Sequence, residues 1–465
     1  MQTSSYRLPV ISYKGFTLIE SLVFLFIFAI VSMVFLQTYA VGTRLIIESK
    51  NRLGATALAN QKMEIVRSID YTTIGTKHWN GTAWVYGIPA GDILENETIN
   101  VNTVHYSVDT DVRYVDDAFD GKSGDSPNDT IPNDYKRVKI SVSWGAQGAD
   151  QTVILTSDVA PDGLETAGSG GVLSINILDM PGAGVSDATV RIVNTSAGVD
   201  TTTQTDAAGN ITLPGAAVGD QEYALTISKN DYYGAVTYPP YPTSSFNPVD
   251  IHASVVANAL NPDVVRIDRA ADIEIDTKDP FGTAVSNINF SITGGRVIGN
   301  VPNTNPVQPV YDFTQDTSTD VSGQKTFANQ SFGTYTVAVS GSGYTFYKIS
   351  PESSLVNGLD VSPGEDFVGQ VILLDNALGS VFVKVTNAAD GSAIEGAAAH
   401  LTNAIAGYDT TQTTDKFGFA YFPTALPGLV AGTYTLEVSK SGFQTDNGTF
   451  SVGSALVTRT IQLAL

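Results

Sequence analysis

The feature that most constrains this chain is an uncharged apolar run near its N-terminus. No charged residue occurs from Ser21 to Gly42, and most side chains in between are Leu, Ile, Val, Phe or Ala. A helix that spans a bilayer needs ~20 such residues. Arg7 and Lys14 precede the run, and positive charge on that side keeps an N-terminus in the cytoplasm. The sequence therefore predicts one membrane span at about 17–42, with everything C-terminal to it outside.

The residues just before the run form an unusual string, Lys14-Gly15-Phe16-Thr17-Leu18-Ile19-Glu20. No small-residue cleavage site of the secretory kind follows the apolar run, so an ordinary signal peptide fits less well. A carboxylate at the start of a membrane helix, such as that of Glu20, is costly and usually functional. The helix dipole also favours an acidic residue at this end for structural reasons alone. From Glu20 by itself, both interpretations stay open.

The whole string resembles the prepilin motif of type IV pilins and type II secretion pseudopilins. The resemblance implies that a prepilin peptidase cuts between Gly15 and Phe16, and that the new amino group of Phe16 is methylated. Glu20 would become the fifth residue of the mature chain, the assembly position that pairs with the N-terminal amine of a neighbouring subunit. A carboxylate in a filament core of low dielectric needs such a cationic partner.

The helix is expected to continue beyond the membrane. Between Thr43 and Arg67, apolar residues recur at helical spacing, at Ala55, Ala59, Met63 and Val66, with Leu58 and Ile65 widening the same face. At 1.5 Å per residue, a helix over Phe16–Arg67 is about 78 Å long. Many major pilins carry Pro where this chain has Gln37, which favours a minor pilin or a pseudopilin.

Residues 71–160 predict a β-rich head covered by that helix. Alternation of apolar and polar residues, typical of a sheet with one covered face, occurs in Val104–Val115, Val138–Trp144 and Thr152–Leu155. Together with the helix, this is an α+β, pilin-like head. Residues 161–171 have the composition of a linker.

An acidic segment lies between two of these strands. Its Asp116, Asp117, Asp120 and Asp125 could supply oxygen ligands to Ca²⁺. Their spacing does not match an EF-hand, and Asp, Gly and Pro are equally common in a solvated hairpin loop. Calcium is the only cofactor that the sequence suggests, and both interpretations stay open.

The remainder of the chain repeats loosely at a period near 100 residues, which predicts three β-sandwiches over 172–268, 269–376 and 377–465. Each repeat has four shared features. The first is an opening strand, at Val172–Leu178, Ala271–Ile275 and Ser380–Val385. The second is another strand, at Val185–Ile192, Val285–Ile292 and Ile394–Leu401. A Thr-Asp turn ending in Gly and a strand containing Tyr follow, the latter at Glu222–Ser228, Thr334–Ser340 and Thr433–Ser439.

The repeat pattern resembles the carboxypeptidase regulatory-like, or prealbumin-like, sandwich of surface proteins. The middle repeat departs from it by a Pro/Asn-rich insertion near Val301–Pro309. The resemblance implies that these sandwiches act mainly as stalk and presentation modules, as they do in other surface proteins.

Composition narrows the functional classes. Of 465 residues, 25 are Lys or Arg, 47 are Asp or Glu, and none is Cys. Met1–Arg67 carries seven basic and three acidic residues, whereas the remainder carries 18 and 44. A strongly acidic chain does not suit nucleic acid. The four histidines are scattered, and no catalytic motif occurs, so we expect no enzyme and no catalytic residue.

These observations predict a multidomain chain: a leader at 1–15, an N-terminal helix at 16–70, a head at 71–160 and three all-β, Ig-like or prealbumin-like sandwiches. The expected function is that of a type IV pilin-like minor subunit, a single-pass membrane precursor that matures into an extracellular pilus component for surface attachment. Expected partners are the prepilin peptidase, other pilins, the membrane and a surface glycan or host-cell ligand. Two alternatives stay open, a type II secretion pseudopilin and a membrane-anchored carbohydrate-binding surface protein.

Overall fold

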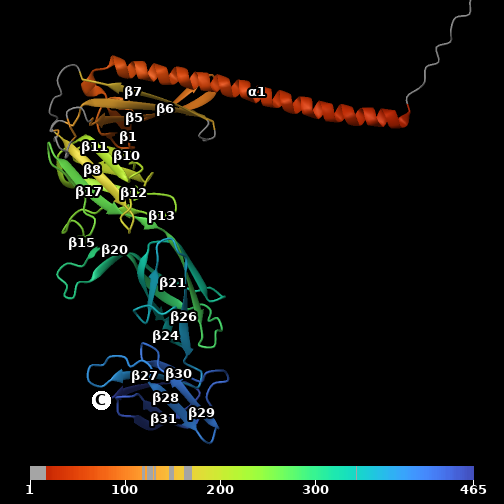
Figure 1. Ribbon diagram of the computed structural model, residues 1–465, viewed down its shortest axis with the longest axis vertical. Helices are drawn as coiled ribbons and strands as arrows, with labels where there is room; N and C mark the ends of the chain where they lie inside the picture. The colour runs from red at the N-terminus through yellow and green to blue at the C-terminus, as the bar shows by residue number, and fades with distance from the viewer. Residues whose placement is uncertain are drawn as a thin grey trace, which may run out of the picture. The chain divides into compact units, whose positions relative to one another are not determined.

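The computed structural model describes residues 17–117, 121–122, 129, 132–145, 151–161, 170–341 and 343–465. Contacts within the chain divide it into two compact units, Met1–Gly168 and Ser169–Leu465 (Figure 1). The first unit holds the long helix and one sheet with its flanking strands. The second is built from strands. The expected fold class, a long N-terminal helix followed by several β-sandwiches, is confirmed.

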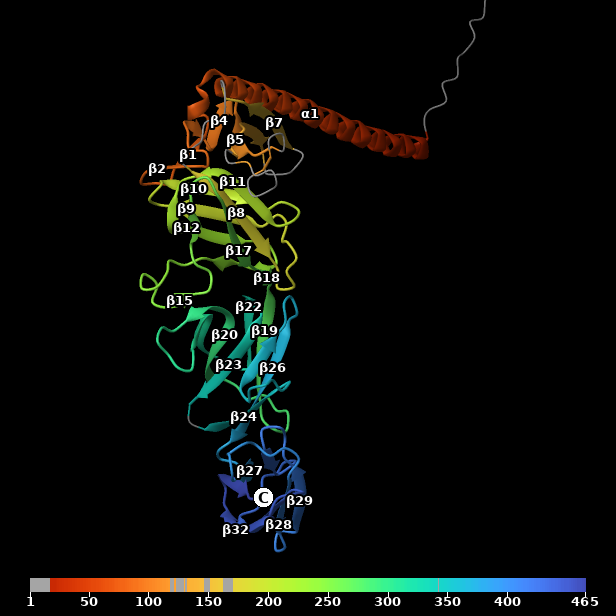
Figure 2. The same ribbon diagram turned by 60° about the vertical axis from the view of Figure 1, so that its left-hand side comes forward.

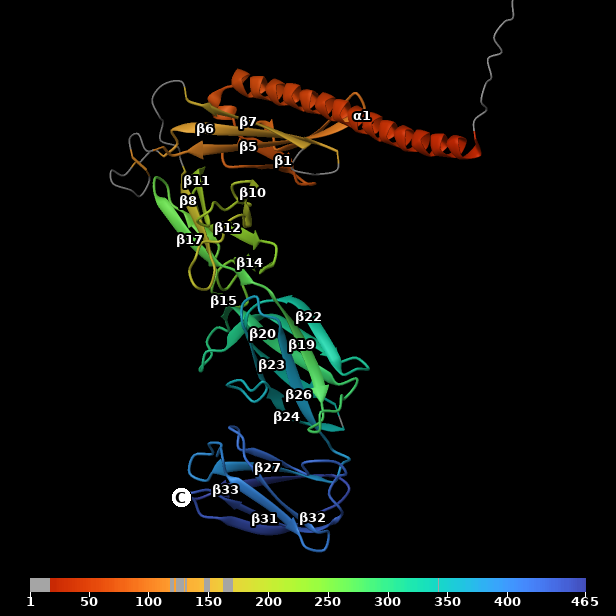
Figure 3. The ribbon, with the colours of Figure 1, turned by 45° about the vertical axis from the view of Figure 1, so that its right-hand side comes forward.

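Helix α1 extends from Leu18 to Ser68, about 77 Å at 1.5 Å per residue. Figures 1 and 3 show that its C-terminal part lies over a sheet while its N-terminal part extends away from that sheet. Its buried residues all fall near the C-terminal end, at Ala55, Leu58, Ala59, Met63 and Val66. The predicted buried face is therefore confirmed, except that Ile65 is exposed. A short 3-10 helix, Tyr71–Thr73, follows α1.

The strands of the first unit follow in chain order. They are β1 (Thr76–Trp79), β2 (Trp84–Tyr86), β3 (Ile93–Leu94), β4 (Asn96–Val101), β5 (Val104–Val115), β6 (Tyr135–Trp144) and β7 (Thr152–Val159). Strands β4-β5-β6-β7 form an antiparallel sheet in that order. Every second residue of β5 from Tyr106 to Val112 is buried, as are Val138, Ile140 and Val142 of β6. These side chains form one core with the buried face of α1, so the sheet and the helix cover each other.

The second unit contains three groups of strands, which we name the first, second and third sandwich. The first comprises β8 (Gly171–Leu178), β9 (Thr189–Asn194), β10 (Val199–Gln204), β11 (Asn210–Ala216), β12 (Gly219–Ser228), β13 (Tyr232–Tyr233), β14 (Ala235–Val236), β15 (Asn247–Pro248), β16 (Ala253–Val255), β17 (Leu260–Arg266) and β18 (Asp268–Arg269). The second comprises β19 (Ala271–Lys278), β20 (Asn289–Asn300), β21 (Pro309–Ser318), β22 (Gln324–Gln330), β23 (Gly333–Ser340), β24 (Tyr344–Ser350), β25 (Gly358–Val361) and β26 (Phe367–Asp375). The third comprises β27 (Ser380–Asn387), β28 (Ala398–Asn403), β29 (Tyr408–Thr413), β30 (Phe419–Phe422), β31 (Gly432–Ser439), β32 (Asp446–Val452) and β33 (Leu456–Leu463).

The three sandwiches share one topology. In each, the opening strand lies between an antiparallel and a parallel neighbour, giving the orders β11-β8-β17, β22-β19-β26 and β30-β27-β33. In the opposite sheet of each sandwich, the strand with the buried Tyr pairs antiparallel with the second strand of the repeat. These pairs are β12–β9, β23–β20 and β31–β28. Figure 2 shows the two layers of the first sandwich, and Figure 3 those of the third.

The repeated sequence features have repeated structural roles. The Tyr side chains of the three equivalent strands are fully buried, and each hydroxyl donates to a carbonyl a few residues upstream: Tyr223 to Ala217, Tyr335 to Ser331 and Tyr434 to Val430. The predicted Thr-Asp-Gly turns also recur, and each Gly has a φ of 75° to 80°, which favours glycine. The repeat therefore encodes both the hydrogen bond that fixes a core tyrosine and the turn before the next strand.

Two strand predictions need correction or refinement. The second strands were expected to begin at Val185, Val285 and Ile394, but they begin four residues later. In each case the amide of that residue donates back to the opening strand, and a turn follows before the strand starts. The insertion predicted near Val301–Pro309 connects β20 to β21. The domain boundaries themselves stay predictions.

Candidate functional site

The N-terminal end of α1 is a complete capping box. The backbone N–H and the hydroxyl of Thr17 both donate to Glu20 Oε2, at 3.0 and 2.9 Å. In return, the Glu20 N–H donates to Thr17 Oγ1 at 3.3 Å. A capping box satisfies two donors that a helix start otherwise leaves without partners. Glu20 thus has a local role at the helix start, and the pattern Thr17-x-x-Glu20 could have indicated it from sequence.

From this cap onward, α1 exposes apolar side chains on all sides. Leu, Ile, Val, Phe and Met between Leu18 and Leu53 are exposed throughout, and the segment is long and apolar enough to cross a membrane. Apolar surface of this extent is not stable in water and marks a membrane or protein-contact surface. Phe24 and Phe28 lie one turn apart, with ring centroids 6.3 Å from each other. The structure thus leaves free the surface that a bilayer, or neighbouring helices, would cover.

The two predicted processing residues, Gly15 and Phe16, lie outside the described residues. Cleavage between them and methylation of Phe16 stay predictions that rest on the sequence. The capping box begins at Thr17, one residue after the predicted new N-terminus at Phe16.

The side chain of Lys136, in β6, binds the segment that follows α1. The sequence did not identify this residue. Its ammonium donates to the carbonyl oxygens of Tyr71 and Ile74, at 2.7 and 2.6 Å. The nitrogen also lies 4.6 Å from the Tyr71 ring centroid and 5.2 Å from that of Tyr114. The side chain is almost completely buried, and burial lowers the pKa of Lys136 to about 8. Lys136 occupies a position of β6 that faces the core in the alternating pattern. That pattern gives no indication that a lysine is buried there.

The acidic segment connects β5 to β6, which are paired neighbours. Of the four predicted calcium ligands, Asp120 and Asp125 lie outside the described residues. Asp117 uses its backbone N–H to donate to the carboxylate of Asp134, which brings the two ends of the segment together, and Asp116 precedes it. Among the described residues, no group of three or more Asp, Glu or His side chains gathers around one point. Calcium binding by this segment stays a prediction.

The four histidines lie at separate places and have separate partners. His78 contacts Glu95 at 2.7 Å and His400 contacts Asp409 at 2.7 Å. His105 lies against Asn100, and His252 against Thr237. The prediction that the chain is not an enzyme stays a prediction.

A comparison with protein-family models identifies a prokaryotic N-terminal methylation motif at residues 12–36. The matched range contains the predicted cleavage point, the capping box and most of the predicted membrane span, up to residue 36. It confirms the resemblance that the string from Lys14 to Glu20 suggested. A comparison with curated proteins found no match.

Among solved structures, the Bacillus anthracis TIE protein is 15% identical, with 85% of this chain and 73% of that chain covered and a TM-score of 0.19. A streptococcal ancillary pilin is 12% identical, with 63% and 98% covered and a TM-score of 0.19. BcpA, the major pilin subunit of Bacillus cereus, is 11% identical, with 63% and 99% covered and a TM-score of 0.16.

Proposed function

We propose that this type IV pilin-like chain is a minor pilin. In the proposed pathway, prepilin peptidase removes residues 1–15, Phe16 is N-methylated, and α1 passes from the membrane into a pilus by packing against the helices of other pilins. The β-rich second unit would then be presented outside the cell for surface attachment, to a glycan or a host-cell ligand. The proposed division into sandwiches at 172–268, 269–376 and 377–465 makes them successive presentation modules.

One observation carries this proposal. The methylation motif overlaps the start of a helix that exposes apolar side chains over Leu18–Leu53 and buries apolar side chains against a sheet over Ala55–Val66. A helix that only anchored a protein would need no contact with its head. A helix that only formed a soluble core would not expose Leu, Ile and Phe on every side. The combination suits a subunit that is first held in a membrane and then packed by its neighbours.

The proposal can be tested at Glu20, because its two possible roles respond differently to substitution. Glu20→Gln keeps an acceptor for Thr17 and can preserve the capping box, but it removes the charge. Glu20→Val removes both. If pairing with the amine of a neighbouring subunit is required, both variants are cleaved normally but neither enters filaments. Cleavage is read from the mass of the N-terminus, and incorporation from sheared pili.

Three outcomes are distinguishable in this experiment. Normal incorporation of Glu20→Gln together with loss of Glu20→Val would reduce Glu20 to a helix cap. Normal incorporation of both variants would contradict the assembly role altogether. Glu64→Gln, on the exposed side of the same helix, is the matched control and should be incorporated normally. Incorporation into secretion pseudopili in place of surface pili would favour the pseudopilin alternative.

Calcium binding by Asp116, Asp117, Asp120 and Asp125 belongs to the proposal as a separate point. Several carboxylates close together in a glycine-containing sequence suit a hard cation with oxygen ligands. Calorimetric titration with Ca²⁺ should give heat that Asp120→Asn together with Asp125→Asn abolishes. No heat at millimolar Ca²⁺ would remove calcium from the proposal without affecting the role of α1.

A further inference from the structure

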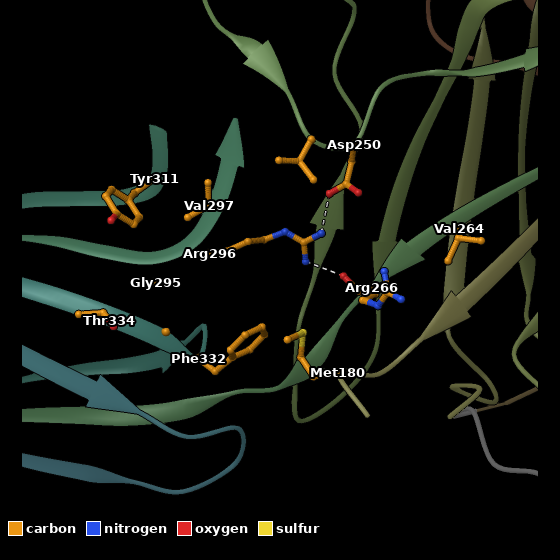
Figure 4. A pocket seen from close by; sticks show the side chains of 12 residues that line it. Met180, Asp250, Val264, Arg266, Gly295, Arg296, Val297, Tyr311, Phe332 and Thr334 are labelled. Carbon is orange, nitrogen blue, oxygen red and sulfur yellow. Dashed lines mark hydrogen bonds and ion pairs between the residues drawn. The ribbon is translucent and has the colours of Figure 1, made fainter. Parts of the chain in front are cut away.

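A pocket of about 420 Å³ lies within the second unit, where the first and second sandwiches meet (Figure 4). One wall comes from the first sandwich and includes Asp250 and Arg266. The other comes from the second sandwich and includes Arg296 and Phe332. The volume falls in the range of ~300–1,000 Å³ that is typical of small-molecule sites, which often lie between domains.

Backbone pairing fixes the two walls relative to each other. Strand β15, which belongs to the first sandwich, pairs with β20 of the second, with Asn247 opposite Asn300 and Pro248 opposite Gly299. The ladder continues as the Val249 N–H donates to the Ile298 carbonyl at 2.9 Å. Backbone hydrogen bonds therefore join the two walls next to Val249 and Val297, which both line the pocket.

The lining has two glycines at which a side chain would not fit. Gly295 has a φ of 75°, and a Cβ there would lie 2.5 Å from the Tyr335 hydroxyl oxygen. Gly333 has a φ of 133°, and a Cβ there would lie 2.8 Å from the Gly295 carbonyl oxygen. Both values are too short for a carbon contact, so this part of the wall must be bare backbone.

Apolar side chains from both sandwiches converge on this pocket while remaining accessible. Met180, Val249, Val264 and Val297 line it, and they are between 38% and 59% exposed. Single exposed apolar residues are common on a protein surface. Four of them around one pocket offer a surface for the apolar part of a ligand.

Of the two arginines that line the pocket, Arg296 has hydrogen-bond partners within the chain and the guanidinium of Arg266 has none among the described residues. Arg296 donates to Asp250 at 2.7 Å and to the Arg266 carbonyl at 2.6 Å, and Figure 4 shows its guanidinium between these two residues. Both members of this ion pair are about 15% exposed. Among the described residues, no hydrogen bond or ion pair joins the guanidinium of Arg266, which also lines the pocket. The lining therefore holds two arginines and one carboxylate. The carboxyl group of Asp312, which follows Tyr311 in β21, also interacts electrostatically with Arg296, so Arg266 is the arginine left for a ligand.

The remaining polar groups are few. Asp250 is committed to Arg296, and the Thr334 hydroxyl donates to Asp360 at 2.8 Å. This leaves the Tyr311 hydroxyl and the Arg266 guanidinium as polar side-chain groups of the described lining that have no protein partner. A guanidinium without a protein partner favours an anionic ligand, such as a carboxylate, over a neutral sugar.

We propose that this pocket binds a small organic carboxylate with an apolar body. The carboxylate would accept two parallel hydrogen bonds from Arg266, since a guanidinium matches a carboxylate in geometry and charge. The apolar body would lie against Val249, Val264 and Val297. This site is independent of the assembly role of α1, and binding there is measurable without a filament.

The test uses the full chain in detergent micelles with 3-(4-fluorophenyl)propionate, followed by fluorine NMR against empty micelles. The matched neutral probe is the corresponding amide, which has the same apolar body and no charge. We expect the carboxylate to bind at least tenfold more tightly than the amide. Arg266→Gln should weaken carboxylate binding at least tenfold, and Val264→Trp should abolish binding of the carboxylate by filling the pocket.

Arg269→Gln is the control, because Arg269 is an exposed arginine of the same sandwich that does not line the pocket. It should change affinity less than twofold. Thermal unfolding followed by circular dichroism checks that each variant folds. Absence of binding, equal binding of acid and amide, or no effect of Arg266→Gln would overturn the proposal. Displacement of the carboxylate by N-acetylglucosamine at similar concentration would also overturn it, since it would show a sugar site.

Discussion

The N-terminal and C-terminal parts of α1 differ in their surroundings although they form one continuous helix. In the N-terminal part, Leu18–Leu53, the large apolar side chains are exposed, whereas Ala55, Leu58, Ala59 and Met63 of the C-terminal part are buried against the sheet. The boundary lies where Tyr106 of β5 donates to the Asn51 carbonyl at 3.0 Å. The N-terminal part therefore needs an external partner, and the C-terminal part already has one inside the chain.

The backbone of α1 is continuous, so the two parts of the helix differ only in what contacts their side chains. The C-terminal part is rich in Ala, which allows the helix to approach the sheet closely. The N-terminal part is rich in Phe, Leu, Ile and Val, which suit lipid or the helices of other subunits. The same substitution should therefore change the stability of the first unit strongly in the C-terminal part and little in the N-terminal part.

The largest expected effect is on the leucines. Leu58→Ala, at a 7% exposed position, should lower the free energy of unfolding of the first unit by about 2–5 kcal/mol, because it leaves a cavity under the helix. Leu45→Ala, at a 60% exposed position on the same helix, should change it by less than about 0.5 kcal/mol. All three tryptophans, Trp79, Trp84 and Trp144, belong to the first unit, so their fluorescence during chemical unfolding reports on it alone. Similar losses at both leucines would contradict the division of the helix.

The next effect concerns two glycines of α1. A Cβ at Gly54 would lie 2.5 Å from the Tyr106 hydroxyl oxygen, whereas at Gly42 no atom lies within 4 Å. Gly54→Ala should destabilise the first unit by about 1–3 kcal/mol, since overpacking exceeds the gain in helix propensity. Gly42→Ala should not destabilise it. Equal effects in the same fluorescence measurement would show that the boundary at Tyr106 is loose.

Much of the fold could be predicted from the sequence because its elements are strongly periodic. The buried face of α1 follows from residues three or four positions apart, and β5 has the predicted bounds, Val104–Val115. The exposure of Ile65 could not be predicted, because the sheet covers a narrower stripe than the apolar pattern suggests. The second strands of the sandwiches start late because Val185, Val285 and Ile394 bond to the opening strand, a contact that periodicity does not encode.

The candidate site was predictable only where it is local. The string from Lys14 to Glu20 identifies the motif without any structure, and Thr17 and Glu20 are three positions apart, so their capping box was also readable. Arg266 and Arg296 are brought together by the pairing of two sandwiches, and no local pattern indicates their proximity. Lys136 occupies a core position of β6. Its two carbonyl partners, those of Tyr71 and Ile74, are 65 and 62 residues away in the sequence, so no local pattern indicates them.

A smaller effect is expected from pH, through the link between α1 and the sheet. Lys136 has a pKa of about 8 in the folded chain against 10.5 as its ordinary value. Between these values the unfolded chain holds a proton that the folded chain has lost, so raising the pH favours the folded state. The free energy of unfolding of the first unit should therefore increase from pH 8 to about pH 9.5. Above that range, Tyr114 opposes the trend, because burial raises its pKa and its ionisation favours unfolding.

Lys136→Met should remove this increase, whatever its effect on stability at neutral pH. Lys139→Met is the matched control, since Lys139 is an exposed lysine of the same strand, and it should leave the pH dependence unchanged. An identical slope in the wild-type chain and in Lys136→Met would show that the amine of Lys136 does not titrate in this range.

The smallest effect is expected from the ion pair at the end of α1. Arg67 contacts Glu64 at 2.7 Å, but the two side chains are 54% and 70% exposed, and exposed pairs contribute only ~0.2–1 kcal/mol. Arg67→Ala should therefore lower the free energy of unfolding by about 0.5 kcal/mol or less, and 1 M salt should remove most of this difference by screening. This ion pair lies within α1, and the contact of Arg67 with the sheet is a 3.3 Å hydrogen bond to Ser157 of β7. A loss near that of Leu58→Ala would mean that the polar contacts of Arg67 stabilise the first unit as much as apolar packing under the helix does. The small loss expected here, beside the large one at Leu58, would show that apolar packing dominates.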